Sequence, residues 1–220
     1  MWRLRLTALL LAFACAAQAA DSNITIDDLT QRAGQGDRSA MHALAESYYA
    51  GSNGAPQDFS RAAEWYLRLA KAGDARAQTT LGLMYARGYG VAKNLAEAQR
   101  WWNFAAIQND PGAQFNLGLS YATGQGSTTD FQRAAHWFRE AADRGHVQAQ
   151  HNLGMLYHEG KGVPKDQALA YYWMRVAALQ GDAAATEALG RLRIGLSPEQ
   201  ITEAEKLAAA WKQKPLKAIR

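Results

Sequence analysis

The chain has 220 residues, enough for one ordinary domain or for a short stack of structural repeats. Alanine, leucine, glycine, tryptophan and tyrosine are abundant while β-branched residues are sparse, which favours closely packed helices over a sheet. The formal net charge is +4, too small an excess to predict binding to nucleic acid or to a membrane surface.

The N-terminus has the composition of a secretory signal. Two arginines precede an apolar run from about Leu6 to Ala16, and Ala17 and Ala19 have the spacing of a signal-peptidase site. We therefore assign residues 1–19 to a signal peptide and expect export, to the periplasm if the host is Gram-negative. No later run reaches the roughly 18 apolar residues of a transmembrane helix, so no membrane span is expected.

Cys15 is the single cysteine of the chain and is a conceivable site of lipid attachment. Phe13 stands where a lipobox has a small residue, which argues against a lipoprotein. Cleavage after Ala19 would remove Cys15 and leave a mature chain without disulfides, whose stability then comes from packing.

Three columns of residues recur at an interval of 36. The tryptophans are Trp65, Trp101, Trp137 and Trp173, each three positions after an alanine. The glycines are Gly82, Gly118, Gly154 and Gly190, and the tyrosines are Tyr85, Tyr121 and Tyr157. A fixed period of this length indicates stacked repeats.

The period divides the chain into repeats with a cap at each end. A capping half-repeat is expected over residues 20–36. Full repeats follow at about 37–73, 74–109, 110–145 and 146–181, with a degenerate fifth at 182–195. Residues 196–220 are predicted to form a capping helix and a basic tail. Ser197, Pro198 and Gln200 fit the N-cap, first-turn proline and N3 partner of that helix, which should close the last repeat.

Each repeat is predicted to be a helical hairpin. In the third repeat Ala113, Leu117 and Tyr121 lie four residues apart, which places them on one stripe of a first helix, helix A. After a glycine-containing loop, FQRAAHWFREAADRG restores the helical spacing and forms helix B. A glycine inside helix A costs roughly 1 kcal/mol, so its recurrence predicts a closely packed neighbouring helix.

Residues that favour helix ends support these boundaries. Gly181 suits the left-handed conformation that ends a helix, and Asp182 suits the N-cap of the next one. Gly73 and Asp74 have the same two roles at the end of the first repeat. Paired glycines also separate helix A from helix B, at Gly88 and Gly90, Gly124 and Gly126, and Gly160 and Gly162. They follow no strand and lack the third glycine of a dinucleotide loop, so we interpret them as turns.

The pattern AxxxLGxxYxxGxGVxxxxxxAxxWxxxAAxxG occurs as AQTTLGLMYARGYGVAKNLAEAQRWWNFAAIQN from Ala77 and as AQHNLGMLYHEGKGVPKDQALAYYWMRVAALQG from Ala149. It resembles the Sel1-like repeat over roughly Asp37 to Gly195. The resemblance implies an all-α, right-handed superhelical solenoid of antiparallel helix pairs, related to tetratricopeptide arrays, with a concave face lined by the A helices. It also implies an adaptor, scaffold or regulator of other proteins.

Positions two, six and nine after the helix A alanine are expected to face away from the core stripe and to line the concave groove. They are His42, Glu46 and Tyr49; Thr79, Leu83 and Ala86; Phe115, Leu119 and Ala122; and His151, Met155 and His158. An apolar centre with a polar rim is typical of a protein-binding surface. The alternative is that these side chains only pack against the next A helix.

No pattern of residues indicates a catalytic, metal or cofactor site. His151 and His158 are two helical turns apart, about 10 Å, which is too far for one metal ion to bridge. No serine lies in a nucleophile elbow, and acidic residues do not recur as inward-facing pairs. We therefore predict no catalytic residue, no metal and no cofactor.

The sequence favours a non-enzymatic protein–protein interaction module of the cell envelope, whose partner is another protein. One alternative is an immunity protein that neutralises a periplasmic toxic effector, suggested by an export signal on a small repeat protein. A second is a cell-wall or β-lactam hydrolase or a glycan-binding protein. Relatives that bind penicillin-like ligands carry paired cysteines in each repeat, which this chain lacks.

Overall fold

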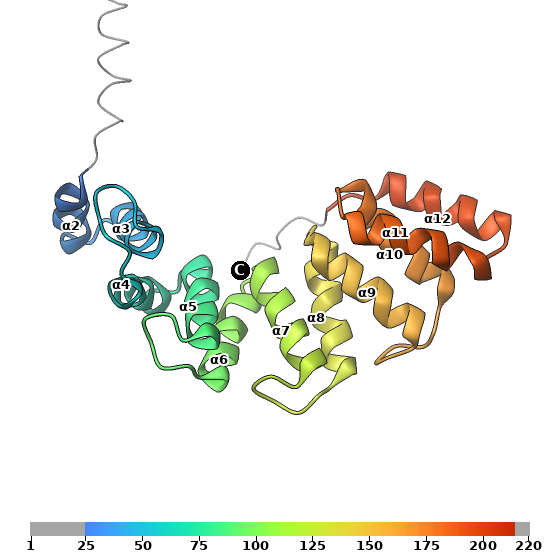
Figure 1. The fold of residues 1–220 in the computed structure, drawn as a ribbon, viewed down its shortest axis with the longest axis horizontal. Coiled ribbons are helices and arrows are strands. Elements are labelled where there is room, and N and C mark those ends of the chain that lie inside the picture. Colours follow the sequence, from blue (N-terminus) through green and yellow to red (C-terminus); the bar gives the residue numbers. More distant parts are fainter. Residues whose placement is uncertain (1–24, 214–220) are drawn as a thin grey trace, which may run out of the picture. The chain divides into compact units, whose positions relative to one another are not determined.

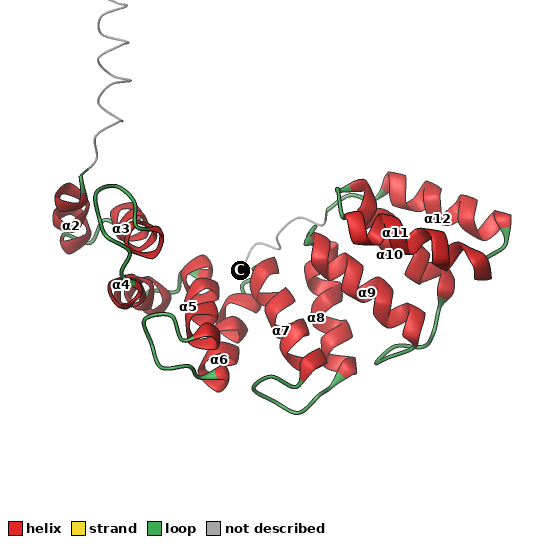
Figure 2. Cartoon of the chain, viewed as in Figure 1, coloured by secondary structure: helices red, strands yellow, loops and turns green. Residues whose placement is uncertain are grey.

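The computed structural model describes residues 25–213, and every regular element in that range is helical (Figure 2). The all-α fold class is confirmed. The helices are α2 (Ile26–Gly34), α3 (Arg38–Ala50), α4 (Phe59–Lys71), α5 (Ala75–Arg87), α6 (Leu95–Ala106), α7 (Pro111–Thr123), α8 (Phe131–Asp143), α9 (Val147–Glu159), α10 (Gln167–Leu179), α11 (Ala183–Leu192), a 3-10 turn (Arg193–Gly195) and α12 (Pro198–Ala210). The expected signal peptide, Cys15 and the tail residues Lys214, Lys217 and Arg220 lie outside the described residues.

The chain divides into two compact units, residues 1–69 and residues 70–220, with the division inside α4. In the first unit α2 packs against α3. Arg32 Nη2 donates to Asp37 Oδ2 over 2.7 Å, and the Asp37 side chain caps α3. The hydroxyl of Ser39 and the guanidinium of Arg32 hold the pKa of Asp37 well below its usual range, which keeps this cap charged.

In the second unit the helices pack in the order of the predicted hairpins (Figure 1). Helix A packs on helix B of the same repeat in the pairs α5 with α6, α7 with α8, and α9 with α10. Each helix B also packs against the next helix A, in the pairs α6 with α7, α8 with α9, and α10 with α11. The unit is therefore a stack in which each helix from α6 to α10 has neighbours on both sides.

The recurring glycine of helix A lies against helix B of the same repeat. A Cβ atom placed on Gly118 would be 2.5 Å from Cδ1 of Phe138, and one on Gly82 would overlap the indole of Trp102. Neither position has room for a methyl group. The predicted close approach of a neighbouring helix is confirmed at both glycines.

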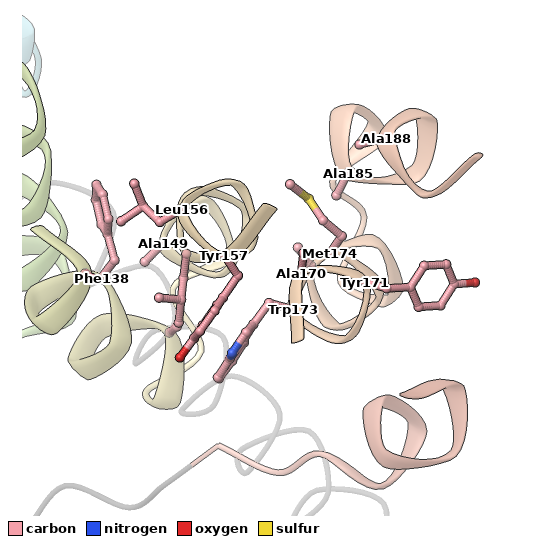
Figure 3. Close-up of a cluster of buried hydrophobic side chains, with 14 of the residues drawn as sticks. Phe138, Ala149, Leu156, Tyr157, Ala170, Tyr171, Trp173, Met174, Ala185 and Ala188 are labelled. Atoms are coloured by element: carbon pink, nitrogen blue, oxygen red, sulfur yellow. The ribbon is translucent and has the colours of Figure 1, made fainter. Parts of the chain in front are cut away.

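The tryptophan column is only partly buried. Trp101 and Trp137 are half-buried, while Trp173 is buried. The side chains one position later face helix A instead and are buried in each case: Trp102, Phe138 and Met174. Figure 3 shows Met174 and Trp173 leaving α10 in different directions, with Trp173 beside Tyr157. The core of each hairpin therefore centres on the residue that follows the tryptophan.

The predicted helix boundaries are confirmed at the junctions between repeats. Gly181 has a φ of +94°, and Oδ1 of Asp182 accepts the N–H of Ala185 over 2.8 Å. Asn109 stands where the other repeats have glycine, and its φ of +68° shows that it takes the same left-handed conformation.

The second glycine of the inter-helix loop packs against the preceding repeat in the third and fourth repeats. A Cβ on Gly126 would lie 2.9 Å from the carbonyl oxygen of Leu95, and one on Gly162 would overlap the carbonyl oxygen of Phe131. Leu95 and Phe131 are the first residues of α6 and α8. These loops are turns, as predicted, and they also bring successive repeats into contact.

The C-terminal end of the second unit departs from the repeat. The capping box is confirmed, since Ser197 Oγ accepts the N–H of Gln200 and the Gln200 side chain accepts the N–H of Ser197. We expected this helix to close the last repeat, but α12 packs mainly against α10. Tyr171, whose ring points away from Met174 (Figure 3), donates through its hydroxyl to Glu205 of α12 over 3.0 Å. As a result, no atom lies within 4 Å of the place of a Cβ on Gly190 of α11.

Candidate functional site

In the second unit, the polar residues at position two of helix A contact the N-cap of the following helix A. Thr79 Oγ1 donates to Asp110 Oδ1 over 2.9 Å. His151 Nδ1 lies 3.4 Å from Asp182 Oδ2. Both aspartates also cap their own helices, so these pairs connect one repeat to the start of the next. At this position the side chains pack against the next A helix, the alternative interpretation of the sequence.

Phe115 makes the equivalent contact in the third repeat through its ring. It stacks on His146, with the ring centroids 4.4 Å apart and the planes 17° apart. His146 caps α9 by accepting the N–H of Ala149 at Nδ1 over 3.3 Å. Burial lowers the pKa of His146, against the opposing charge of Asp110, and the neutral ring is the form that can accept this bond. Phe115 is therefore partly a structural residue.

Position six carries the most exposed apolar side chain of the predicted face, Leu119, while Met155 at the same position also packs against the core. Leu119 is 42% exposed, while Leu83 and Met155 are half-buried. Leu119 also lines a hollow of about 40 Å³ with Leu95 and Trp102 of α6. The three apolar residues occur at the same place on α7, α5 and α9, and they leave part of each helix A open to a partner.

Position nine adds one polar residue to the second unit. His158 Nδ1 lies 3.0 Å from Gln167 Oε1 of α10, while Ala86 and Ala122 are half-buried against the core. His151 and His158 therefore have different partners. Within residues 25–213 no group of three or more His, Cys, Asp and Glu side chains could hold a metal ion.

The first repeat supplies three further predicted residues, which belong to the first unit. Glu46 is exposed, and His42 and Tyr49 are half-buried. The Tyr49 ring packs edge to face on Phe59, with 5.2 Å between the centroids. The involvement of all three in binding stays a prediction.

Sequence reasoning missed a larger hollow, a groove of about 580 Å³ between α10 and α12. Its lining includes Leu169 and Tyr172 of α10, at positions where the earlier B helices have charged or polar residues. That substitution pattern is visible in the sequence. The apolar residues of α10 form a groove only because α12 packs beside α10, and the repeat pattern does not predict that packing.

The sequence of the repeats matches the family model of the Sel1 repeat over residues 38–74, 75–110, 111–146 and 147–182. The chain belongs to the Sel1 repeat family. This fold is a protein-interaction fold that is generally non-catalytic. No helix among the described residues combines the length and apolarity needed to cross a bilayer.

Solved structures agree with this assignment. The protective antigen c5321 of uropathogenic Escherichia coli, which displays an SLR fold, is 32% identical with a TM-score of 0.77, and the match covers 84% of this chain but only 40% of that one. A Sel1 repeat protein from Oxalobacter formigenes is also 32% identical, with a TM-score of 0.68 and 84% of each chain covered. The immunity protein Pa5087 of Pseudomonas aeruginosa reaches only 21% identity and a TM-score of 0.49, too low to carry an argument. A comparison with curated proteins found no match.

Proposed function

We propose that this Sel1 repeat protein is a non-enzymatic adaptor of the bacterial cell envelope. It binds a partner protein through the open part of its helix A face, the surface formed by positions two, six and nine of the A helices. The observation that carries the proposal is the apolar column at position six. Leu119 is 42% exposed, and Leu83 and Met155 occupy the same place on neighbouring A helices. The residues at position two stabilise this surface, because their contacts hold successive A helices together.

A pull-down from envelope extract tests the surface. The bait is the mature protein, compared with a variant carrying Leu83→Glu and Leu119→Glu. Phe115 is left intact because its ring stacks on the cap of α9. The matched control is Ile107→Glu, which places the same charge on a side chain that is 70% exposed at the end of α6. We expect the partner to bind the parent and the control and to be lost from the double variant, with circular dichroism showing that all three are folded. A partner retained by the double variant would place the binding surface elsewhere.

The envelope location is part of the proposal and rests on residues 1–19. Their charged start, apolar run and small residues before Ala20 are the features of an exported precursor. Cell fractionation of a tagged chain, with and without residues 2–19, tests it. We expect the full chain in the envelope fraction and the shortened chain in the cytoplasm; the same distribution for both would reject the proposal.

The identity of the captured partner separates the adaptor from the alternatives drawn from the sequence. A toxic effector, neutralised when the two proteins are mixed, would indicate an immunity protein. Release of product from peptidoglycan or from a chromogenic β-lactam would instead indicate a hydrolase.

A further inference from the structure

The groove between α10 and α12 is an open apolar surface. Its volume of about 580 Å³ lies in the range of binding sites for ligands and peptide side chains. Leu169 of α10 is 38% exposed and Leu207 of α12 is 50% exposed, and Tyr172 and Trp211 add aromatic rings to the lining. Side chains of this size are usually covered in a folded protein, so their exposure along one groove points to a binding surface.

The apolar face of α10 distinguishes the last full repeat from the two repeats before it. Leu169 and Tyr172 lie 36 and 72 residues after side chains that are charged or polar. These are Glu97 and Arg100 on α6, and Arg133 and His136 on α8. Helix α12 covers only part of this face. Its alanines Ala204 and Ala208 are buried, whereas Leu207 remains open beside Leu169.

The charged residues of the lining are all acidic. Asp166 and Glu203 contribute carboxylates and Gln200 an amide, and no lysine or arginine is part of the lining. The Nζ atom of Lys206 lies 3.7 Å from the Glu203 carboxylate, but both side chains are largely exposed, so this pair is weak and exchangeable. A cationic group of a ligand would meet complementary charge here.

We infer that this groove binds a basic amphipathic helix of a partner protein. The apolar side of that helix lies on Leu169, Leu207 and Trp211, and its lysines or arginines lie beside Asp166 and Glu203. A groove between two helices accepts a third helix whose apolar residues recur every three or four positions. The groove shares no residue with the helix A face, so this inference does not depend on the adaptor surface proposed above.

The probe is a fluorescent helical peptide with leucines at positions i, i+3, i+4 and i+7 and lysines at the flanks. It is titrated with the full-length mature protein and followed by fluorescence anisotropy. We expect saturable binding on the order of micromolar affinity, as is common for a small interface. A second peptide with glutamates in place of the lysines should bind about tenfold more weakly or not at all.

Two pairs of variants locate the site. Leu207→Glu should weaken binding about tenfold or more, whereas Leu179→Glu should not, because Leu179 is 51% exposed on α10 but lies outside the groove. Glu203→Lys should weaken binding several-fold, whereas Glu187→Lys should not. Glu187 is also an exposed glutamate with a nearby cation on its own helix, Arg191 at 3.9 Å, but it lies on α11.

Other occupants of the groove give different results. If the peptide binds a chain ending at Gln213 but not the full-length chain, residues 214–220 fill the groove and the inference is wrong. If the chain dimerises in sedimentation experiments and Leu207→Glu abolishes the dimer, a second copy is the occupant. Equal binding by all four variants would also overturn the inference.

Discussion

Gly118 and Gly190 occupy the same position of the 36-residue repeat, but their surroundings differ. A Cβ on Gly118 would lie 2.5 Å from Phe138, whereas nothing lies within 4 Å of a Cβ on Gly190. The difference arises because α8 packs on α7, while α12 packs on α10 and leaves this side of α11 open. A recurring glycine therefore marks close packing inside the stack but not at its end.

The largest expected effect comes from an internal contact between repeats. Gly162→Ala should lower the free energy of unfolding by about 3 kcal/mol, because a Cβ would overlap the backbone of Phe131 and the φ of +71° disfavours alanine. Gly181→Ala is the control, since its φ of +94° imposes the backbone cost without a nearby atom, and it should lose about 1 kcal/mol. Urea denaturation followed by circular dichroism measures both. Equal losses would show that the loop contact contributes nothing.

Gly118→Ala should have the next largest effect, a loss of about 1–2 kcal/mol. Overpacking against Phe138 costs about 1–3 kcal/mol, and the better helix propensity of alanine returns up to about 1 kcal/mol. Phe138→Leu should be less destabilising in the Gly118→Ala background than in the parent, because the smaller side chain makes room for the methyl group. Additive losses in this double-mutant cycle would contradict the contact.

The 36-residue period and the residues that punctuate helices were enough to predict the fold. Gly181 and Asp182, for example, end one helix and cap the next in the predicted way. The period alone does not show which of two adjacent side chains faces the partner helix, because neighbouring residues on a helix point about 100° apart. Trp137 is therefore half-buried while Phe138 fills the core.

The candidate site was harder to predict, because it depends on contacts between repeats. Thr79 lies on the predicted face, but its bond to Asp110 joins residues 31 positions apart and is not visible within one repeat. The groove beside α10 depends on the packing of α12. The capping box at Ser197 predicts where that helix begins but not which helix it lies against.

Gly190→Ala should raise the free energy of unfolding, whereas Gly118→Ala should lower it. With no atom near the added methyl group, only the helix propensity and the lower chain entropy of alanine remain, so we expect a gain of about 0.5–1 kcal/mol. The same urea experiment measures it. A loss at Gly190 would mean that the side of α11 that carries Gly190 is covered in solution.

The smallest effect compares the caps of α9 and α11. His146 caps α9 in its neutral form, and burial lowers its pKa below the ordinary value of 6.5, whereas Asp182 caps α11 with a carboxylate. Below pH 6.5 the unfolded chain takes up a proton at His146 more readily than the folded chain does. Stability that is complete above this pH therefore falls as the pH drops from 6.5 towards the lower folded pKa. His146→Asp should flatten this fall below about pH 6.5, measured as the shift of the urea midpoint against the parent. An unchanged pH dependence in the variant would show that the cap of α9 does not discriminate between the charged and the neutral form of the His146 ring.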